Sequence, residues 1–267
     1  MSNTFNFKRF GKYLCHDLMS AWQNAGVSVI TVACMPLWFF AIYELFCLVF
    51  KGSFGTMSTG LGIAAVLVSF FLAVIFFPVQ IYGKVTDKRP GSNYLMLPAS
   101  AFEKTLSMLI VLCVALPLIW VAIISANDLL LSLTGIYNGP VVESISGGIE
   151  KMLAEFHTEN MDLAIGGPYA LYLSWCADAL AFALGAILFR KNKIVYTFLS
   201  LMGIGILITI VIGLIANGFN FDFNLGPEDI NEDSLMRLLN IIIYSLYVIE
   251  FAVLDLGIYF RIKTLKH

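Results

Sequence analysis

The sequence predicts an all-α integral membrane protein, and three observations carry that prediction. The 267 residues are 59% hydrophobic and 13% charged, and their mean hydropathy is +0.85. A soluble domain of this size could not cover so much apolar surface. The apolar residues fall into runs long enough to cross a bilayer as helices. The basic residues gather in segments that follow every second run, which is typical of a multi-pass protein.

An amphipathic interfacial helix is expected over residues 5–22. Its apolar residues recur at steps of three and four, at Phe7, Phe10, Leu14 and Leu18. Basic residues lie between them, at Lys8, Arg9 and Lys12. This pattern suits a helix in the headgroup layer, with Trp22 near the point where the chain enters the bilayer. Such a helix serves either as a plain membrane anchor or as an anchor that also contacts a partner.

Six spans are predicted in a single transmembrane domain covering the whole chain. They lie at about 26–50, 60–82, 105–126, 167–189, 194–216 and 235–260. Pro36 is expected to kink the first span. The turn between the fourth and fifth spans is so short that these two helices should be antiparallel neighbours.

The distribution of Lys and Arg sets the expected topology. Every basic residue except Lys51, Lys151 and Arg237 falls in the N-terminal helix, the loop after the second span, the turn after the fourth span or the C-terminal tail. Basic segments are retained in the cytoplasm. Both termini are therefore predicted to be cytoplasmic, and the acidic segments 127–166 and 217–233 extracytoplasmic. A bacterial inner membrane is the expected location.

Several kinds of chemistry lack the residues they require. The histidines, His16, His157 and His267, lie outside the predicted spans, and no HExxH, GxSxG or Walker A motif occurs. The five cysteines form no CxxC pair that would indicate a metal or disulfide framework. The chain is therefore expected to bind no metal, to be no enzyme and to have no nucleic-acid partner. If it uses ATP, another chain must bind the nucleotide.

The loop 84–104 is the long polar connection on the basic side. Ser100 and Glu103 fit a capping box, in which a serine hydroxyl and a glutamate carboxylate satisfy the free amides of a helix's first turn. A helix is therefore predicted to begin at Ser100. The loop is either an ordinary basic connection between two spans or a docking site for a soluble partner.

Four acids occur inside the apolar runs: Glu44, Asp178, Glu250 and Asp255. An ionised carboxylate in hydrocarbon is costly, so each should face the protein interior, a water-filled cavity or a partner subunit, or be protonated. They are candidates for a polar transport path. The alternative is that each forms interhelical hydrogen bonds as a neutral acid.

Small residues mark two candidate helix-packing stripes, because helices in lipid approach closely only where side chains are small. The stripe in the fourth span is Ala177, Ala181 and Gly185. The stripe in the fifth span includes Gly205, Thr209 and Gly213. We interpret both as helix contacts.

The layout resembles the type-2 permeases of ATP-binding-cassette (ABC) exporters. The shared features are a basic amphipathic N-terminal helix, six spans with both ends inside, a substantial loop after the second span and a tight turn after the fourth. The segment Tyr94-Leu95-Met96-Leu97-Pro98-Ala99-Ser100-Ala101-Phe102-Glu103-Lys104 is similar to the LPxS pattern, with a basic residue opening the third span, seen especially in permease-like proteins of Bacteroidetes. The outer segment 127–166 is longer than this resemblance leads us to expect.

The resemblance implies that loop 84–104 is a coupling loop seated on an ABC ATPase subunit. The implied coupling residues are Lys88, Arg89, Tyr94, Leu97, Pro98, Ser100, Phe102, Glu103 and Lys104. ATP and Mg would be held by the ATPase and not by this chain. Two such permeases, as a homodimer or a heterodimer with a related chain, would form the pore within membrane lipid.

The expected function is therefore the permease subunit of an exporter that moves an amphipathic or lipid-like substrate. One alternative is a membrane scaffold or sensor that uses the loop for protein contacts without transport. Another is a proton-coupled carrier with proton sites at Asp178, Glu250 and Asp255. The latter is weakened because no internal repeat is visible.

Overall fold

The computed structural model describes residues 5–53, 55, 59–87, 91, 94, 96–133, 168–218 and 232–265, with backbone only at 59, 168–171, 212–213, 215–218 and 232–243. Across these ranges the regular structure is helical, without a strand, which confirms the all-α prediction. The helices are α1 Phe7–Ala33, α2 Met35–Lys51, α3 Thr59–Tyr82, η1 Gly83–Thr86, α5 Ala101–Ile110, η2 Val111–Ala115, α6 Leu116–Ser132, α8 Pro168–Leu188, α9 Lys193–Gly218 and α10 Glu232–Thr264. Most of the predicted outer segments, 127–166 and 217–233, lies outside the described residues.

Several of the described helices have the length and composition of membrane spans. Gly60–Thr86, Ala101–Ser132 and Lys193–Val211 are each long and apolar enough to cross a membrane. The bent pair α1 and α2 adds a fourth if it counts as one span. The fully described part of α8, Tyr172–Leu188, is apolar but shorter. These helices fit a membrane-embedded protein.

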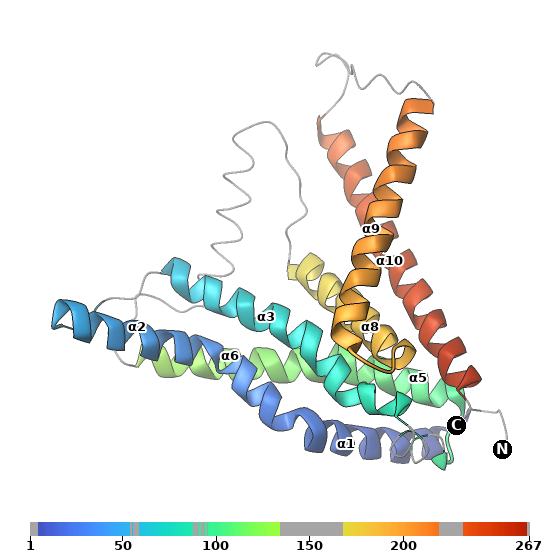
Figure 1. Cartoon of the computed structure of the whole chain (residues 1–267), viewed down its shortest axis with the longest axis horizontal. Coiled ribbons are helices and arrows are strands. Elements are labelled where there is room, and N and C mark those ends of the chain that lie inside the picture. Colours follow the sequence, from blue (N-terminus) through green and yellow to red (C-terminus); the bar gives the residue numbers. More distant parts are fainter. Residues whose placement is uncertain are drawn as a thin grey trace.

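The helices pack around α3 and α8. Helix α1 lies against α3 and α5, α8 packs between α3 and α10, and α9 contacts chiefly α8. The starts of α1 and α5 and the end of α10 come together at one end of the molecule (Figure 1). We call this region the polar end and define it as 5–9, 83–87, the described part of 94–104, Lys193 and 261–263.

Helix α1 runs without a break from the N-terminal segment into the first predicted span. It has no turn at Trp22, so the amphipathic helix and the first third of that span, 26–33, are one element. Its buried residues recur mainly at every fourth position, at Tyr13, Asp17, Ala21, Ala25, Val29 and Ala33. Phe7 is 82% exposed, whereas Phe10, Leu14 and Leu18 are half-buried beside that face. The buried face is thus shifted by about one residue from the predicted stripe.

The predicted kink at Pro36 is confirmed. Helices α1 and α2 meet at an angle of 40°. Proline has no N–H to donate, and its ring crowds the carbonyl four residues earlier, which here is that of Val32. Ser69 Oγ on α3 donates to Val32 O at 2.8 Å, and Asn127 Nδ2 on α6 donates to Ala33 O at 2.7 Å. Side chains from neighbouring helices therefore replace the hydrogen bonds lost at the bend.

A second proline produces a π-helical turn in the middle of the 101–132 helix. Pro117 cannot donate to Cys113 O four residues before it. In the same turn, Leu116 N–H reaches back five residues to Val111 O, which leaves Leu112 O outside the regular ladder. Two consecutive carbonyls are thereby released toward neighbouring elements.

Helix α8 supplies the donors for these two carbonyls. Tyr172 Oη donates to Cys113 O at 2.7 Å, and Trp175 Nε1 donates to Leu112 O at 3.1 Å. Trp175 is buried and its ring lies 5.5 Å from that of Trp120 on α6. The proline-induced turn thus fixes which face of α8 meets the third predicted span.

Candidate functional site

The first turn of α5 is closed by the predicted capping box. Ser100 Oγ accepts a hydrogen bond from Glu103 N, and Glu103 Oε2 accepts one from Ser100 N at 2.8 Å. Ser100 is the N-cap and Ala101 the first helical residue, so the predicted start of the helix is confirmed. This cap fixes the point at which the loop enters the long apolar helix of residues 101–132.

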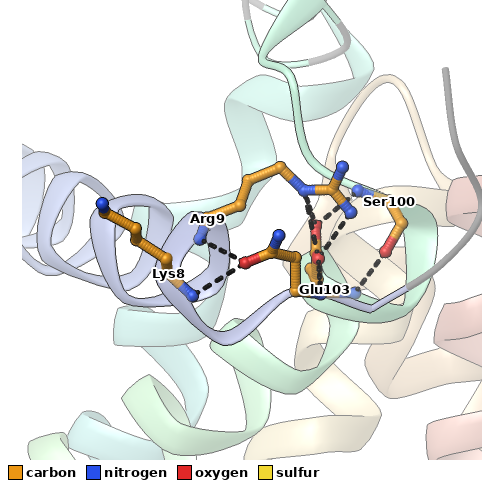
Figure 2. A network of polar contacts seen from close by, with 5 residues as sticks. Lys8, Arg9, Ser100 and Glu103 are labelled. Atoms are coloured by element: carbon orange, nitrogen blue, oxygen red, sulfur yellow. Dashed lines mark hydrogen bonds and ion pairs between the residues drawn. The ribbon is translucent and has the colours of Figure 1, made fainter.

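The Glu103 carboxylate also binds the N-terminal segment. Arg9 Nη2 approaches Glu103 Oε1 at 2.7 Å, and Arg9 Nε donates to Oε2 at 2.9 Å (Figure 2). The N–H of Asn6 donates to Oε1 at 3.0 Å. The Glu103 side chain is fully buried, whereas that of Arg9 is 28% exposed. One carboxylate therefore holds both the start of α5 and the start of α1.

These contacts keep Glu103 ionised. Burial alone would raise its pKa, but hydrogen bonds from Arg9, Ser100 N and Asn6 N, together with the guanidinium charge, lower the pKa from 4.5 to about 2. Glu103 precedes the predicted third span, 105–126. It therefore carries a full negative charge opposite Arg9 across the physiological pH range.

A second buried carboxylate joins α1 to α3 and α5. Asp17 Oδ2 accepts hydrogen bonds from Ser107 Oγ at 2.6 Å and from Tyr82 Oη at 3.1 Å. Asp17, Tyr82 and Ser107 are all nearly inaccessible to solvent. Asp17 lies before the predicted first span, and burial raises its pKa while these hydrogen bonds oppose the rise. Three helices are thus held in register by one acid.

Lys104 is buried and contacts the loop that precedes it. Its Nζ donates to Tyr94 O at 2.8 Å and lies 5.1 Å from the centre of the Tyr94 ring. Burial lowers the pKa of this lysine. The side chains of Glu103 and Lys104 therefore serve contacts within the chain, and neither projects from its surface.

The turn between α8 and α9 and the end of α10 meet at η1. Thr86 Oγ1 donates to Ala186 O and Ile187 O at 3.0 and 3.3 Å, and Arg261 Nε donates to Ile187 O at 3.3 Å. Lys193 Nζ donates to Gly83 O and pairs with Asp87 at 3.3 Å. The Thr86 and Arg261 bonds satisfy free carbonyls at the end of α8. The Thr86 and Lys193 bonds connect residues 83–87 to the fourth and fifth predicted spans, and the Arg261 bond connects the sixth to the fourth.

The outward surface of the polar end carries apolar side chains. Met96 is 73% exposed and Phe102 is 53% exposed, and Pro98 is exposed between them in sequence. The Phe102 ring lies 5.8 Å from that of Phe5, itself part of an aromatic group with Phe7. Exposed apolar patches of this kind mark surfaces that meet a protein or a membrane.

The predicted coupling residues thus divide into separate groups. Phe102 and Pro98 lie at the surface, whereas Tyr94, Leu97 and Ser100 are half-buried. Glu103 and Lys104 are buried. Lys88 and Arg89 lie outside the described residues.

The four membrane acids do not converge on one path. Asp178 on α8 and Glu250 on α10 are close enough to interact electrostatically, and both are exposed at the surface of this chain. Asp255 faces the other side of α10, beside α5. Glu44 lies on α2, where its Oε2 accepts a hydrogen bond from Gly55 N at 3.3 Å.

The two small-residue stripes behave differently. Ala177 and Ala181 are buried, and Gly185 lies so close to Thr197 of α9 that a Cβ there would overlap the threonine side chain. Thr209 is exposed, and nothing lies within 4 Å of where a Cβ would stand at Gly205. Gly213 lies where only the backbone is described. Among the residues whose side chains are described, the tight contact is made by the stripe on α8.

The Arg9–Glu103 pair and the Asp17 contacts were not predicted from the sequence. Asp17 follows Tyr13 by four residues on the face of α1 that becomes buried, and that spacing is a usable signal. The Arg9–Glu103 pairing joins residues 94 positions apart, and one sequence offers no means of matching them.

Comparisons of this chain with family models, curated proteins and solved structures yield no match.

Proposed function

We propose that this chain is the six-span permease subunit of an ABC-type exporter in a bacterial inner membrane, with both termini cytoplasmic and a separate ATPase supplying ATP and Mg. The observation that supports this most is the construction of the polar end. A loop with exposed apolar residues at Met96, Pro98 and Phe102 precedes a helix whose first turn is fixed to α1 by the buried Glu103. Such a loop suits a docking site that must transmit movement.

The contacts define a route for that movement. A displacement of the loop by the ATPase would act on Ser100 and Glu103 at the start of α5, and through Arg9 on α1. Thr86 joins the end of η1 to α8, Arg261 joins α8 to α10, and α5 itself packs against α10. Closure of two ATPase subunits would therefore shift the helices as connected bodies and open the interface between two permease subunits outward.

The exposed face of α9 is consistent with the proposed contact to a partner subunit in the membrane. Along the part of α9 whose side chains are described, most residues from 198 to 211 are exposed, including Gly205 and Thr209. In the proposed complex this face meets a second permease or lipid. The amphipathic or lipid-like cargo would move along such apolar surfaces.

Affinity isolation of the chain from its native membrane tests the proposal. Tagged wild-type protein should recover a subunit that carries a Walker A motif, identified by mass spectrometry. The paired change Pro98→Asp and Phe102→Ser should remove that subunit, because it places charge and polarity on the apolar docking surface. Leu133→Ser is the matched control, because Leu133 is 76% exposed outside the polar end.

The two rival functions give different results. Absence of an ATPase, under conditions that preserve known membrane complexes, would contradict the permease proposal and favour a scaffold or sensor. The proximity of Asp178 and Glu250 favours a proton-coupled carrier as the other candidate. In that case Asp178→Asn and Glu250→Gln should abolish pH-driven flux in vesicles without nucleotide.

A further inference from the structure

A groove opens between α5 and α10 next to the polar end. It has a volume of about 250 Å³. Its walls are Phe102, Thr105, Leu106, Leu109, Asp255, Leu256 and Tyr259. Phe102 and Leu256 are each 53% exposed, so the groove communicates with the surface of the helical bundle. In the proposed topology that surface faces the cytoplasmic leaflet of the bilayer.

An unsatisfied carboxyl oxygen lines this largely apolar groove. Oδ1 of Asp255 is buried and accepts no hydrogen bond from the described chain. None of the ion pairs of the described residues includes Asp255. A buried carboxylate oxygen without a partner is costly, and acids within membrane helices characteristically face the protein interior and pair with another ionisable group.

The other polar groups of the groove do not supply that partner. The Thr105 hydroxyl donates to Ala101 O at 3.0 Å. Lys263 lies two turns beyond Asp255 on α10, where its Nζ stands 5.9 Å from the centre of the Tyr259 ring. A positively charged ligand group would therefore meet Asp255 without displacing an internal contact.

We propose that the groove binds a cationic amphiphile, in which an alkylammonium group pairs with Asp255 and the alkyl chain lies along Leu106, Leu109 and Leu256. The ring of Phe102 offers a π-face that also attracts an ammonium group. The volume is below the roughly 300–1,000 Å³ of sites that enclose drug-sized ligands. It fits the ammonium and the first part of the chain, and the remainder lies along the open groove.

Equilibrium binding to the purified chain in a neutral maltoside detergent tests this inference. Tritiated dodecylammonium is bound and then displaced by unlabelled dodecylammonium, dodecanol or dodecyl phosphate. Since the three competitors share one alkyl chain length, differences in their affinity measure the contribution of the headgroup. We expect dodecylammonium to compete about tenfold or more better than dodecanol, as the loss of a charged hydrogen bond implies. Dodecyl phosphate should compete no better than the alcohol.

Variants of groove residues test whether the preference for the ammonium headgroup arises from binding in the groove. Asp255→Asn should reduce dodecylammonium to the level of dodecanol, whereas the control Asp87→Asn, at a half-exposed acid outside the groove, should leave the preference unchanged. Leu106→Trp should weaken all three ligands by filling the groove. Equal competition by amine and alcohol, stronger competition by the phosphate, or an unchanged preference in Asp255→Asn would overturn the inference.

If Asp255→Asn does not yield folded protein, the comparison of the three headgroups on the wild-type chain decides the matter. The assay contains neither nucleotide nor ATPase. Its result is therefore independent of the exporter proposal, and either can fail while the other holds.

Discussion

Glu103 joins the N-terminal segment to the loop before α5, and its environment shows why a carboxylate is required there. It accepts hydrogen bonds from two backbone N–H groups and from the Arg9 guanidinium while its side chain is fully buried. A neutral side chain at this position would leave partly buried donors incompletely satisfied. The Glu103 carboxylate thus both caps α5 and forms the ion pair with Arg9 of α1.

The depressed pKa of Glu103 predicts an acid-sensitive contribution to stability. Because the folded pKa is about 2 and the ordinary value 4.5, the contribution is fully present above about pH 4.5 and is lost as pH falls toward 2. We expect the unfolding temperature of wild-type protein in detergent to fall across this interval. In Glu103→Gln it should be lower at neutral pH and change less on acidification.

Removal of the Asp87–Lys193 pair is the control for this prediction, because the Asp87 side chain is 48% exposed and exposed pairs contribute little. Asp87→Asn should leave the unfolding temperature at neutral pH nearly unchanged. Equal acid sensitivity in wild type and Glu103→Gln would show that Glu103 does not carry the effect.

At the level of elements, two prolines shape the bundle by releasing carbonyls that other helices must satisfy. The break at Pro36 is covered by Ser69 and Asn127, and the π-turn before Pro117 by Tyr172 and Trp175. In lipid an unsatisfied carbonyl has no water to replace its partner. The donors are therefore as much a part of each bend as the prolines are.

Loss of the Asn127 amide should destabilise the bend at Pro36. Asn127→Leu leaves Ala33 O without its donor, which should cost about 1–3 kcal/mol and lower the unfolding temperature measured by tryptophan fluorescence. Ser132→Ala is the control, because that exposed hydroxyl donates to Leu129 O in its own helix and holds no other helix of the described residues. Equal unfolding temperatures of the two variants would show that Asn127 does not stabilise the bend.

The contact between α8 and α9 gives a second test at this scale. Gly185→Val would force its side chain into Thr197, and overpacking of this kind costs about 1–3 kcal/mol. Gly205→Val should be tolerated in the isolated chain, since nothing lies within 4 Å of a Cβ there. Thermal unfolding in detergent distinguishes them. A greater loss in Gly205→Val than in Gly185→Val would contradict the packing described here.

For the molecule as a whole, the features that could be predicted from sequence were those with local causes. The apolar runs predicted the helices, Pro36 predicted the bend, and the spacing of Ser100 and Glu103 predicted the start of α5. Six spans and the cytoplasmic location of both termini remain predictions. They depend on where the bilayer lies, and helix packing alone does not specify that position.

The features that sequence did not predict arise from contacts between distant segments. Arg9 meets Glu103, and Asp17 meets Tyr82 and Ser107, across separations of 65 to 94 residues. The buried state of Lys104 likewise depends on how the loop folds over α5. The candidate docking surface therefore consists of exposed apolar residues such as Met96 and Phe102. The charged side chains of Glu103 and Lys104, predicted to lie on that surface, are buried and make contacts within the chain.

Site-specific photo-cross-linking from the loop tests the central proposal most directly. A benzophenone maleimide is attached through Pro98→Cys in a Cys15→Ser background, since Cys15 is an exposed native cysteine. Illumination in native membranes should join the chain to a subunit that bears a Walker A motif, and the same label at Leu133→Cys should not. Efficient labelling at Pro98→Cys with no adduct to such a subunit, or equal adducts from both positions, would contradict the assignment of this loop as the coupling site.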